Sequence, residues 1–400
     1  MMAEMEKTLE EYRRLLPAAE KYIYMNSAGC GPLPMPVLER MEGVFRRMAL
    51  EGQVNVEIHG WLKEMLEEIR AEVAAFINAK PGEIFFVRCI AEGLNTISRM
   101  YGWEPGDEIL ISDQENPASI LPFFAVEPIF GTRTATFCGL GNQEQIMEQF
   151  KSALNGRTRM TVISHVFHTN GTAVPAAEIC REAEARGVIT VLDGAQAAGN
   201  IDIDVREIGC SFYLLSCHKW LCGPEGVAAV YIREDRIREA RVPFGGVGMQ
   251  DSFDIAEHTI QMKPDAGRFE YGGRHTPMYA AFSESIRFAR EIGTERIRRR
   301  TGELHRYCRK VFAERVPWAE ILSPEDERLR TAIFAFHIPG ADHRELVRRA
   351  WEDCGIIIQW RTVDLVTGKE GVRVSLNWFI REEEIDRLAE EIATLTGEGL

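Results

Sequence analysis

Apolar runs rich in β-branched residues alternate with segments of helical periodicity from residue 83 to residue 232. The runs cover residues 83–87, 108–111, 160–164, 188–193, 212–216 and 227–232. Apolar residues at helical spacing predict helices at 91–101, 118–126 and 175–186. Strands that alternate with helices form a largely parallel sheet whose two faces are covered by those helices. The chain is therefore expected to be an α/β protein.

Two of these runs lead to side chains of opposite charge. Asp193 closes the run 188–193, and Lys219 follows the run 212–216. A lysine amine can bind the aldehyde of pyridoxal phosphate (PLP), and a carboxylate can pair with its protonated pyridine nitrogen. A lone lysine after a strand is more often a surface residue. Polar Ser216 and His218 lie next to Lys219 in the sequence, and a turn follows at 221–226. These neighbours favour a cofactor site over a surface lysine.

Further cofactor contacts are expected nearby. Gln196 follows Asp193 by three residues, so that one turn of chain would bring its amide toward the ring oxygen of PLP. Residues 89–93 lie at a junction between a strand and a helix, where free backbone N–H groups can hold a phosphate. A plain loop explains residues 89–93 equally well.

Composition narrows the class of protein. The net charge of −14, from 47 basic and 61 acidic residues, argues against nucleic acid as a partner. Residues 1–16 are charged, so we expect no signal peptide, and without an apolar run of 18 residues we expect no membrane span. Nine cysteines without paired CxxC spacing predict neither disulfides nor a metal site, and favour a cytoplasmic location.

The remaining chain suggests three parts. We expect an N-terminal segment at 1–20 that packs with the small domain, a large PLP-binding domain at 21–285, and a small α+β C-terminal domain at 286–400. Predicted strands at 332–338, 355–360 and 372–376 and helices at 343–353 and 382–395 support the α+β assignment. The glycine-rich stretch 241–273 is expected to form long loops.

Four groups of residues resemble motifs of a known family. They are Asp193-Gly194-Ala195-Gln196, Ser216-Cys217-His218-Lys219 with Gly223-Pro224, Gly106-Asp107-Glu108, and Arg268-Phe269-Glu270. The chain resembles the fold-type I PLP enzymes of the class V aminotransferase family over nearly its whole length. The most similar branches are cysteine desulfurases of the selenocysteine-lyase type, cystine C–S lyases and isopenicillin N epimerase-like proteins. The resemblance implies a seven-stranded, mostly parallel sheet and a homodimer with active sites at its interface.

The resemblance also assigns roles to individual residues. Lys219 and His168 are the expected catalytic residues. Cofactor contacts are expected from Ile90, Ala91, Asn116, Asp193, Gln196, Ser216, His218, Lys219 and, toward the neighbouring subunit, Gly273. Substrate contacts are expected from Asn26, Ala28, Arg361 and Arg373. Arg373 matches the arginine that clamps the substrate carboxylate, a task suited to a bidentate guanidinium.

Several positions depart from the family pattern. Asn116 stands where the family has a histidine stacked on the ring, and an amide cannot serve as the same acid or base. His168 replaces an asparagine; it either supplies the missing acid/base group or hydrogen-bonds nearby backbone. The segment 359–365 lacks the nucleophilic cysteine of the desulfurases, so persulfide transfer by the usual route is not expected. Cys30 is a candidate nucleophile only if its pKa is lowered.

These features favour a PLP-dependent, desulfurase-like C–S lyase that acts on a small L-amino acid by β-elimination. An amino-acid epimerase or a class V aminotransferase is the alternative, and a pair of proton-exchanging groups, Lys219 and His168, would suit epimerisation. A non-catalytic binding protein of the same fold is the least favoured reading, because Lys219, Asp193 and Arg373 are all intact. The reaction type rests mainly on family analogy.

Overall fold

A seven-stranded sheet forms the centre of the computed structural model, which describes residues 7–364 and 367–397. Its strand order is β2-β8-β7-β6-β5-β3-β4, and only β8 runs against the other strands. The strands are β2 (Ile84–Val87), β3 (Glu108–Ser112), β4 (Arg133–Phe137), β5 (Thr158–Ser164), β6 (Ile189–Asp193), β7 (Phe212–Ser216) and β8 (Ala228–Ile232). The predicted mostly parallel, seven-stranded sheet is confirmed.

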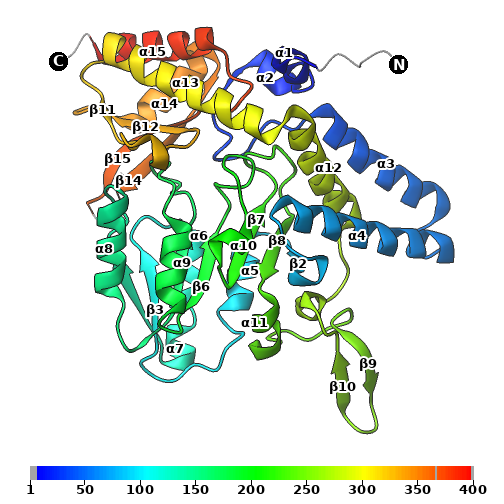
Figure 1. The fold of residues 1–400 in the computed structure, drawn as a ribbon. Helices are drawn as coiled ribbons and strands as arrows, with labels where there is room; N and C mark the ends of the chain where they lie inside the picture. Colours follow the sequence, from blue (N-terminus) through cyan, green and yellow to red (C-terminus); the bar gives the residue numbers. More distant parts are fainter. Residues whose placement is uncertain (1–6, 365–366, 398–400) are drawn as a thin grey trace.

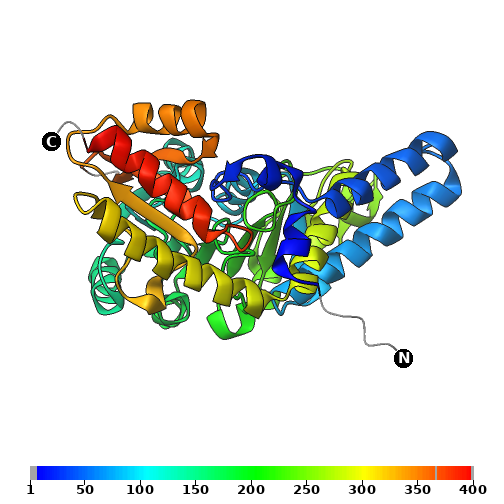
Figure 2. The same cartoon turned by 90° about the horizontal axis from the view of Figure 1, so that it is seen from above.

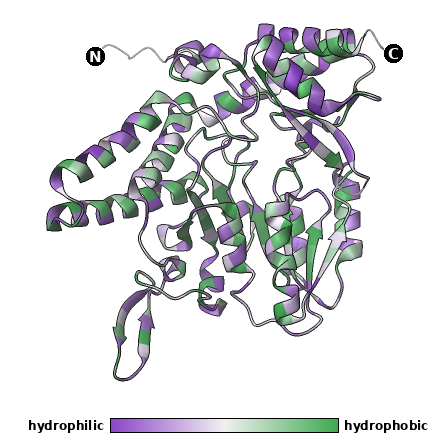
Figure 3. Ribbon diagram, turned by 180° about the vertical axis from the view of Figure 1, so that it is seen from behind, coloured by the Kyte–Doolittle hydropathy of each residue, from purple (hydrophilic) through white to green (hydrophobic). Residues whose placement is uncertain are grey.

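Helices cover both faces of this sheet, because side chains of successive strand residues point to opposite faces. Val191 and Leu214 belong to one buried core, and Leu192 and Tyr213 belong to the other. The surrounding helices are α5 (Ile90–Ile97), α6 (Pro117–Phe124), α7 (Glu127–Phe130), α8 (Gln143–Ala153), α9 (Ala176–Glu184), α10 (Val205–Ile208) and α11 (Glu234–Glu239). Figure 3 shows hydrophobic residues concentrated on the central strands and mixed with hydrophilic ones along the helices.

A second, antiparallel sheet has the strand order β11-β12-β15-β14. Its strands are β11 (Glu320–Ile321), β12 (Ile333–His337), β14 (Gln359–Asp364) and β15 (Lys369–Ser375). Helices α13 (Thr294–Arg315), α14 (His343–Cys354) and α15 (Glu382–Thr396) pack on it, at the top of Figure 1. The expected α+β arrangement is present. The proposed domain limit at residue 285 falls within helix α12 (Thr276–Ile292), and the division at that residue stays a prediction.

The N-terminal part of the chain is tied to the C-terminal part. Helices α1 (Leu9–Arg13) and α2 (Pro17–Lys21) precede β1 (Ile23–Tyr24), which pairs in parallel with β13 (Ile356–Ile357). The buried guanidinium of Arg13 forms an ion pair with Glu384 at 2.8 Å. Figure 2 shows these N-terminal helices lying beside the last helices of the chain.

Two projections extend from the body of the molecule (Figure 1). Long helices α3 (Met35–Glu51) and α4 (Val56–Phe76) pack against α12. Strands β9 (Gln250–Asp254) and β10 (Thr259–Met262) form an exposed hairpin, so the expectation of long loops at 241–273 is wrong there. The hairpin escaped prediction because its mixed, exposed residues give no apolar alternation. Among the described helices, none is long and apolar enough to span a bilayer.

Candidate active site

Lys219 lies just beyond the carboxyl end of β7, at the edge where an open parallel sheet binds ligands. Burial lowers the pKa of its amine to about 8, while the nearby Asp193 carboxylate opposes this shift. The guanidiniums of Arg373 and Arg361 lower the pKa further. The structure thus brings three of the predicted residues together around the Lys219 amine, and part of that amine is unprotonated near neutral pH.

Asp193 ends strand β6, and its carboxylate is held from two sides. The Ser119 hydroxyl donates to Oδ2 at 2.7 Å, and the Ala195 amide donates to Oδ1 at 2.8 Å. Asp193 is only 5% exposed. A carboxylate fixed in this way has one orientation to offer a protonated ring nitrogen.

Gln196 connects the sheet edge to the loop that contains Ala28. Its side-chain amide donates to the Ala28 carbonyl at 2.9 Å, and its side-chain oxygen accepts from the Trp220 indole at 2.8 Å. A primary amide carries two N–H groups, so one remains available for a ring oxygen. The Ala28 amide in turn donates to the Ser375 hydroxyl at 2.9 Å, on β15.

The predicted phosphate contacts gather at the start of α5. Ile90 and Ala91 open this helix after Cys89, which makes no side-chain cap, so the first N–H groups are available to an anion. A Cβ at Gly93 would lie 2.7 Å from Leu214, so only glycine lets this helix approach β7 so closely. Ser216 donates only weakly, at 3.4 Å, to the Ala195 carbonyl.

His218 and Asn116 lie in different environments. Burial, reinforced by Lys219, lowers the pKa of His218 to about 4, so that it is neutral near pH 7. Asn116 caps helix α6, since its side-chain oxygen accepts from the Ala118 amide at 2.9 Å. Gly273 is exposed and lines a separate surface cavity of about 280 Å³ with Arg88 and Glu92.

Arg373 is 1% exposed and lacks a compensating charge. Its guanidinium donates to the His168 carbonyl at 3.0 Å and, at 3.5 Å, to the side-chain oxygen of Asn26. Within residues 7–364 and 367–397, neither Arg373 nor Arg361 has a carboxylate at ion-pair distance. Burial, together with Arg361, lowers the pKa of Arg373 to about 9. A buried cation without a partner is energetically costly, so an anionic ligand would stabilise it.

His168 is also buried at this edge, and its Nδ1 has no hydrogen-bond partner in the described structure. Burial lowers its pKa to about 3, and Arg373, Lys219 and Arg361 act in the same direction. A neutral imidazole near neutral pH can accept or relay a proton more readily than it can act as an imidazolium acid.

The structure disfavours Cys30, the candidate nucleophile, and Cys354, which precedes β13, as reactive thiols. Burial raises the pKa of the Cys30 thiol above its ordinary value, which leaves little thiolate at neutral pH. Cys354 is engaged elsewhere, since its sulfur lies 3.0 Å from a carboxylate oxygen of Glu391 and 3.1 Å from Arg387.

A family model described as aminotransferase class V matches residues 23–388 of the chain. The chain belongs to the class V aminotransferase family. It is 32% identical to isopenicillin N epimerase of Streptomyces clavuligerus over 97% of this chain and 98% of that protein. It is 30% identical to a cysteine desulfurase of Dickeya dadantii over 91% of this chain and 90% of that one.

Solved structures share the fold of this chain. The apo cysteine desulfurase of Thermococcus onnurineus NA1 superposes with a TM-score of 0.89 at 23% identity and covers the whole of both chains. A cystine C–S lyase in complex with its product cysteine persulfide gives 0.87 at 22% identity, over 94% of this chain and 99% of that one. At these identities the likeness establishes the fold.

The residues at the sheet edge fit PLP, the cofactor of class V aminotransferases. Lys219 offers an amine of lowered pKa, Asp193 a fixed carboxylate and Gln196 a free amide N–H. The N–H groups at the start of α5 suit the phosphate. The chain is therefore a PLP-dependent enzyme of this family.

Two further residues at this class V site could not be predicted from the sequence. Ser119 fixes Asp193 although 74 residues separate them. Glu115 is fully buried and accepts from the Ser112 hydroxyl at 2.6 Å, from the Ser164 amide at 2.8 Å and from the Ser164 hydroxyl. Glu115 stands among the polar residues Asp113, Gln114 and Asn116, so the local sequence does not single it out.

Glu115 should make stability depend on pH. Burial raises its pKa to about 7, and Asp193 adds to the shift, whereas the serine donors oppose it. Because the folded pKa exceeds the unfolded one, the stabilisation is complete below about pH 4.5 and is lost as the pH rises through about 7. We expect the free energy of unfolding to fall by up to about 3 kcal/mol over this window.

The variant Glu115→Gln isolates this effect, because glutamine keeps the shape and cannot ionise. Urea unfolding of the cofactor-free protein, repeated between about pH 5 and pH 8, should give a stability difference between variant and wild type that grows with pH. Parallel stability curves for the two proteins would show that Glu115 does not titrate in this range.

Proposed function

We propose that this enzyme is a C–S lyase that eliminates the β-substituent of a small L-amino acid without using a loop cysteine. The observation that carries the proposal is the assembly of Lys219, Asp193 and Arg373 beside a strand that has no cysteine. When bound, PLP supplies an electron sink for Cα of the amino acid. Lys219 is placed to remove the Cα proton, because its lowered pKa gives it free amine near neutral pH.

The segment 359–365, which matches the cysteine-bearing loop of desulfurases, contains no cysteine here. Its described residues form β14, and Gln359 pairs with Arg373 while Arg361 pairs with Gly371 on β15. Leu365, the last residue of the cysteine-free segment, lies outside the described residues. A sulfur leaving group would therefore depart to solvent or to an added thiol rather than to an enzyme persulfide.

The two uncompensated arginines support a substrate with a second anionic group. Arg373 is suited to the α-carboxylate, and Arg361, which is partly buried with an unpartnered Nε, is suited to another anion. L-Cystine carries two carboxylates and a β-sulfur, and so satisfies both arginines and the elimination.

Arg361→Gln should therefore discriminate between substrates. We expect it to raise KM for L-cystine by about 10- to 100-fold, the usual cost of a charged hydrogen bond, and to change KM for L-cysteine much less. Arg361→Lys, which keeps the charge, should recover part of the loss. Steady-state kinetics with both substrates provide the measurement; equal losses for the two would contradict a second anion site.

The reaction itself is tested with L-cysteine, L-cystine and L-alanine. The products to be assayed are pyruvate and sulfide, together with Cα–H exchange in deuterated water. Elimination from L-cysteine gives pyruvate, ammonia and sulfide. Elimination from L-cystine gives pyruvate, ammonia and cysteine persulfide, which an added thiol reduces to sulfide. Exchange in the absence of pyruvate and sulfide would overturn the lyase proposal, and amino transfer to an added keto acid would indicate an aminotransferase.

Epimerisation is the second candidate function. It is favoured by the unpartnered Nδ1 of buried His168 close to Lys219, which gives the site two groups able to exchange a proton. The full-length similarity to isopenicillin N epimerase points the same way. His168→Asn should abolish inversion at Cα of the substrate amino acid and leave elimination largely intact. Chiral chromatography distinguishes these outcomes.

We further propose that the enzyme is a homodimer. The hairpin of β9 and β10 exposes Phe253, Ile255 and Ile260, and in the described chain these strands pair only with each other. Gly273 lies exposed in a loop that a second copy could contact. Sedimentation equilibrium should give twice the chain mass.

All nine cysteines are free thiols, which supports a reducing, cytoplasmic location.

A further inference from the structure

A second cavity of about 610 Å³ lies between helix α13 and the loops that follow β5 and β6. Leu192 pairs with Tyr213, and Asp193 pairs with Leu214, so the Tyr213 and Asp193 side chains point to opposite faces of the sheet. His165 lines the cavity and hydrogen-bonds to the Tyr213 hydroxyl at 2.8 Å. The cavity is therefore separated from the Asp193 carboxylate by the sheet itself.

His305 on α13 lines this cavity with a buried imidazole. The residue is 2% exposed, and neither ring nitrogen makes a hydrogen bond of good geometry to any described residue. Burial lowers its pKa to about 3, and the neighbouring Ile333 backbone opposes this only weakly. The ring is thus a neutral imidazole whose one N–H donor has only a poorly oriented acceptor in the protein, the Ile333 backbone. An unpaired buried donor costs about 1–3 kcal/mol, which a bound acceptor would recover.

Arginines gather around this imidazole. Arg309, Arg330 and Arg306 all lower its pKa through their positive charge. Arg330 is bound to Glu327 at 3.0 Å. Arg306, at the rim, has no carboxylate at ion-pair distance in residues 7–364 or 367–397. The cavity wall carries Arg298, Arg306, Arg328 and Arg330 and also the acidic residues Glu178, Asp202 and Glu327. Arg298, Arg328 and Arg330 are paired with carboxylates, which leaves Arg306 as the lining arginine available to a ligand.

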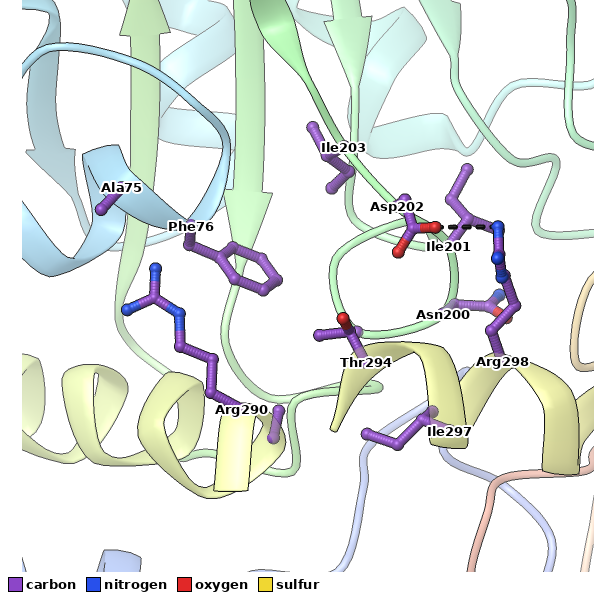
Figure 4. Close-up of a pocket in the computed structure, with 12 residues that line it drawn as sticks. Ala75, Phe76, Asn200, Ile201, Asp202, Ile203, Arg290, Thr294, Ile297 and Arg298 are labelled. Carbon is purple, nitrogen blue, oxygen red and sulfur yellow. Dashed lines mark ion pairs between the residues drawn. The ribbon is translucent and has the colours of Figure 1, made fainter. Parts of the chain in front are cut away.

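One wall of the cavity is an ion pair, which Figure 4 shows from the other side. Arg298 of α13 points at Asp202, and their charged atoms are 2.9 Å apart. Beyond this pair lies the smaller pocket of Figure 4, of about 220 Å³, with Phe76 and Ile297 on its walls. The pair neutralises Arg298, so the unpaired charge of the larger cavity resides with Arg306.

We propose that this cavity binds a small organic anion through its carboxylate or phosphate group, with Arg306 and the His305 imidazole as donors. Its volume lies within the range of ordinary small-molecule sites. A ligand there would contact α13 together with the loops of the seven-stranded sheet, and would hold the two parts of the chain together. The proposal is independent of the reaction at Lys219.

Calorimetric titration of the PLP-loaded enzyme tests the proposal, with inorganic phosphate and succinate as separate probes. Loading fills the cofactor's own phosphate site. Arg306→Gln is expected to weaken binding of the recognised anion by about tenfold or more. The matched control is Arg299→Gln, an exposed arginine of the same helix that does not line the cavity. It should bind like the wild type.

Each outcome decides the matter. Binding of phosphate alone or of succinate alone assigns the class of anion, provided that Arg306→Gln weakens it. Succinate held at Arg373 is recognised because it perturbs the cofactor's visible absorbance and survives Arg306→Gln. His305→Phe, which keeps a planar ring and removes both nitrogens, should also weaken binding while the melting temperature stays equal or rises. Failure of both anions to bind, or equal binding by wild type and Arg306→Gln, overturns the proposal.

Discussion

Lys219→Ala should abolish the covalent link between chain and cofactor and reduce turnover by at least about 10³-fold. The reason is that the amine serves twice, as the nucleophile that holds the cofactor aldehyde and as the base at Cα. The visible absorbance band of the linked cofactor should disappear from the purified variant. Absorbance spectra and a product assay on the same preparation measure both effects.

Two controls separate this result from misfolding. Lys219→Arg keeps a positive charge but not a nucleophilic amine, so it should lose the absorbance band as well. Burial disfavours the charged amine, as its lowered pKa shows, so its removal should not reduce the melting temperature of the cofactor-free protein. A band that persists in Lys219→Ala would mean that another amine holds the cofactor.

Asp193→Asn should reduce kcat by about 10²- to 10³-fold while leaving the covalent link intact. Asparagine preserves the shape and can still meet the Ser119 hydroxyl and the Ala195 amide, which now hold the carboxylate. The variant loses only the negative charge that keeps the ring nitrogen protonated. Single-turnover rates at a fixed, saturating cofactor concentration provide the measurement.

Ser119→Ala is a milder change at the same carboxylate and serves as a comparison with Asp193→Asn. It removes one hydrogen bond to the carboxylate and leaves the charge, so we expect a loss of about tenfold. The order of rates should be wild type, then Ser119→Ala, then Asp193→Asn. Wild-type turnover in Asp193→Asn would remove the basis for placing the ring nitrogen at this carboxylate.

The central strands could be predicted because they are buried on both faces. The predicted run 212–216 coincides with β7, and 188–193 differs from β6 by one residue. Strand β4 was missed, because four of its five residues are at least partly exposed at the sheet edge and give no apolar run. Buried strands can be predicted from their apolar composition. An edge strand forms by pairing with a neighbouring strand from elsewhere in the chain, so its local sequence does not predict it.

The candidate site divides in the same way. Asp193 and Lys219 could be placed because each follows a recognisable strand end. Ser119 and Glu115 could not, since each acts on residues of another strand, 74 and 49 positions away. The missing charge partners of Arg361 and Arg373 were also invisible in the sequence, because only the folded chain reveals which carboxylates lie within reach.

The pairing of β1 with β13 sets the order in which the enzyme can mature during synthesis. The Met25 amide donates to the Ile357 carbonyl, and the Met25 carbonyl accepts from the Ser375 amide. The loop that contacts Gln196 is therefore held by residues that are synthesised last. Until the ribosome has released the C-terminal region, Asn26 and Ala28 lack their hydrogen-bond partners on β15. The emerging chain can fold its central sheet early, but it becomes competent to hold substrate only once it is nearly complete.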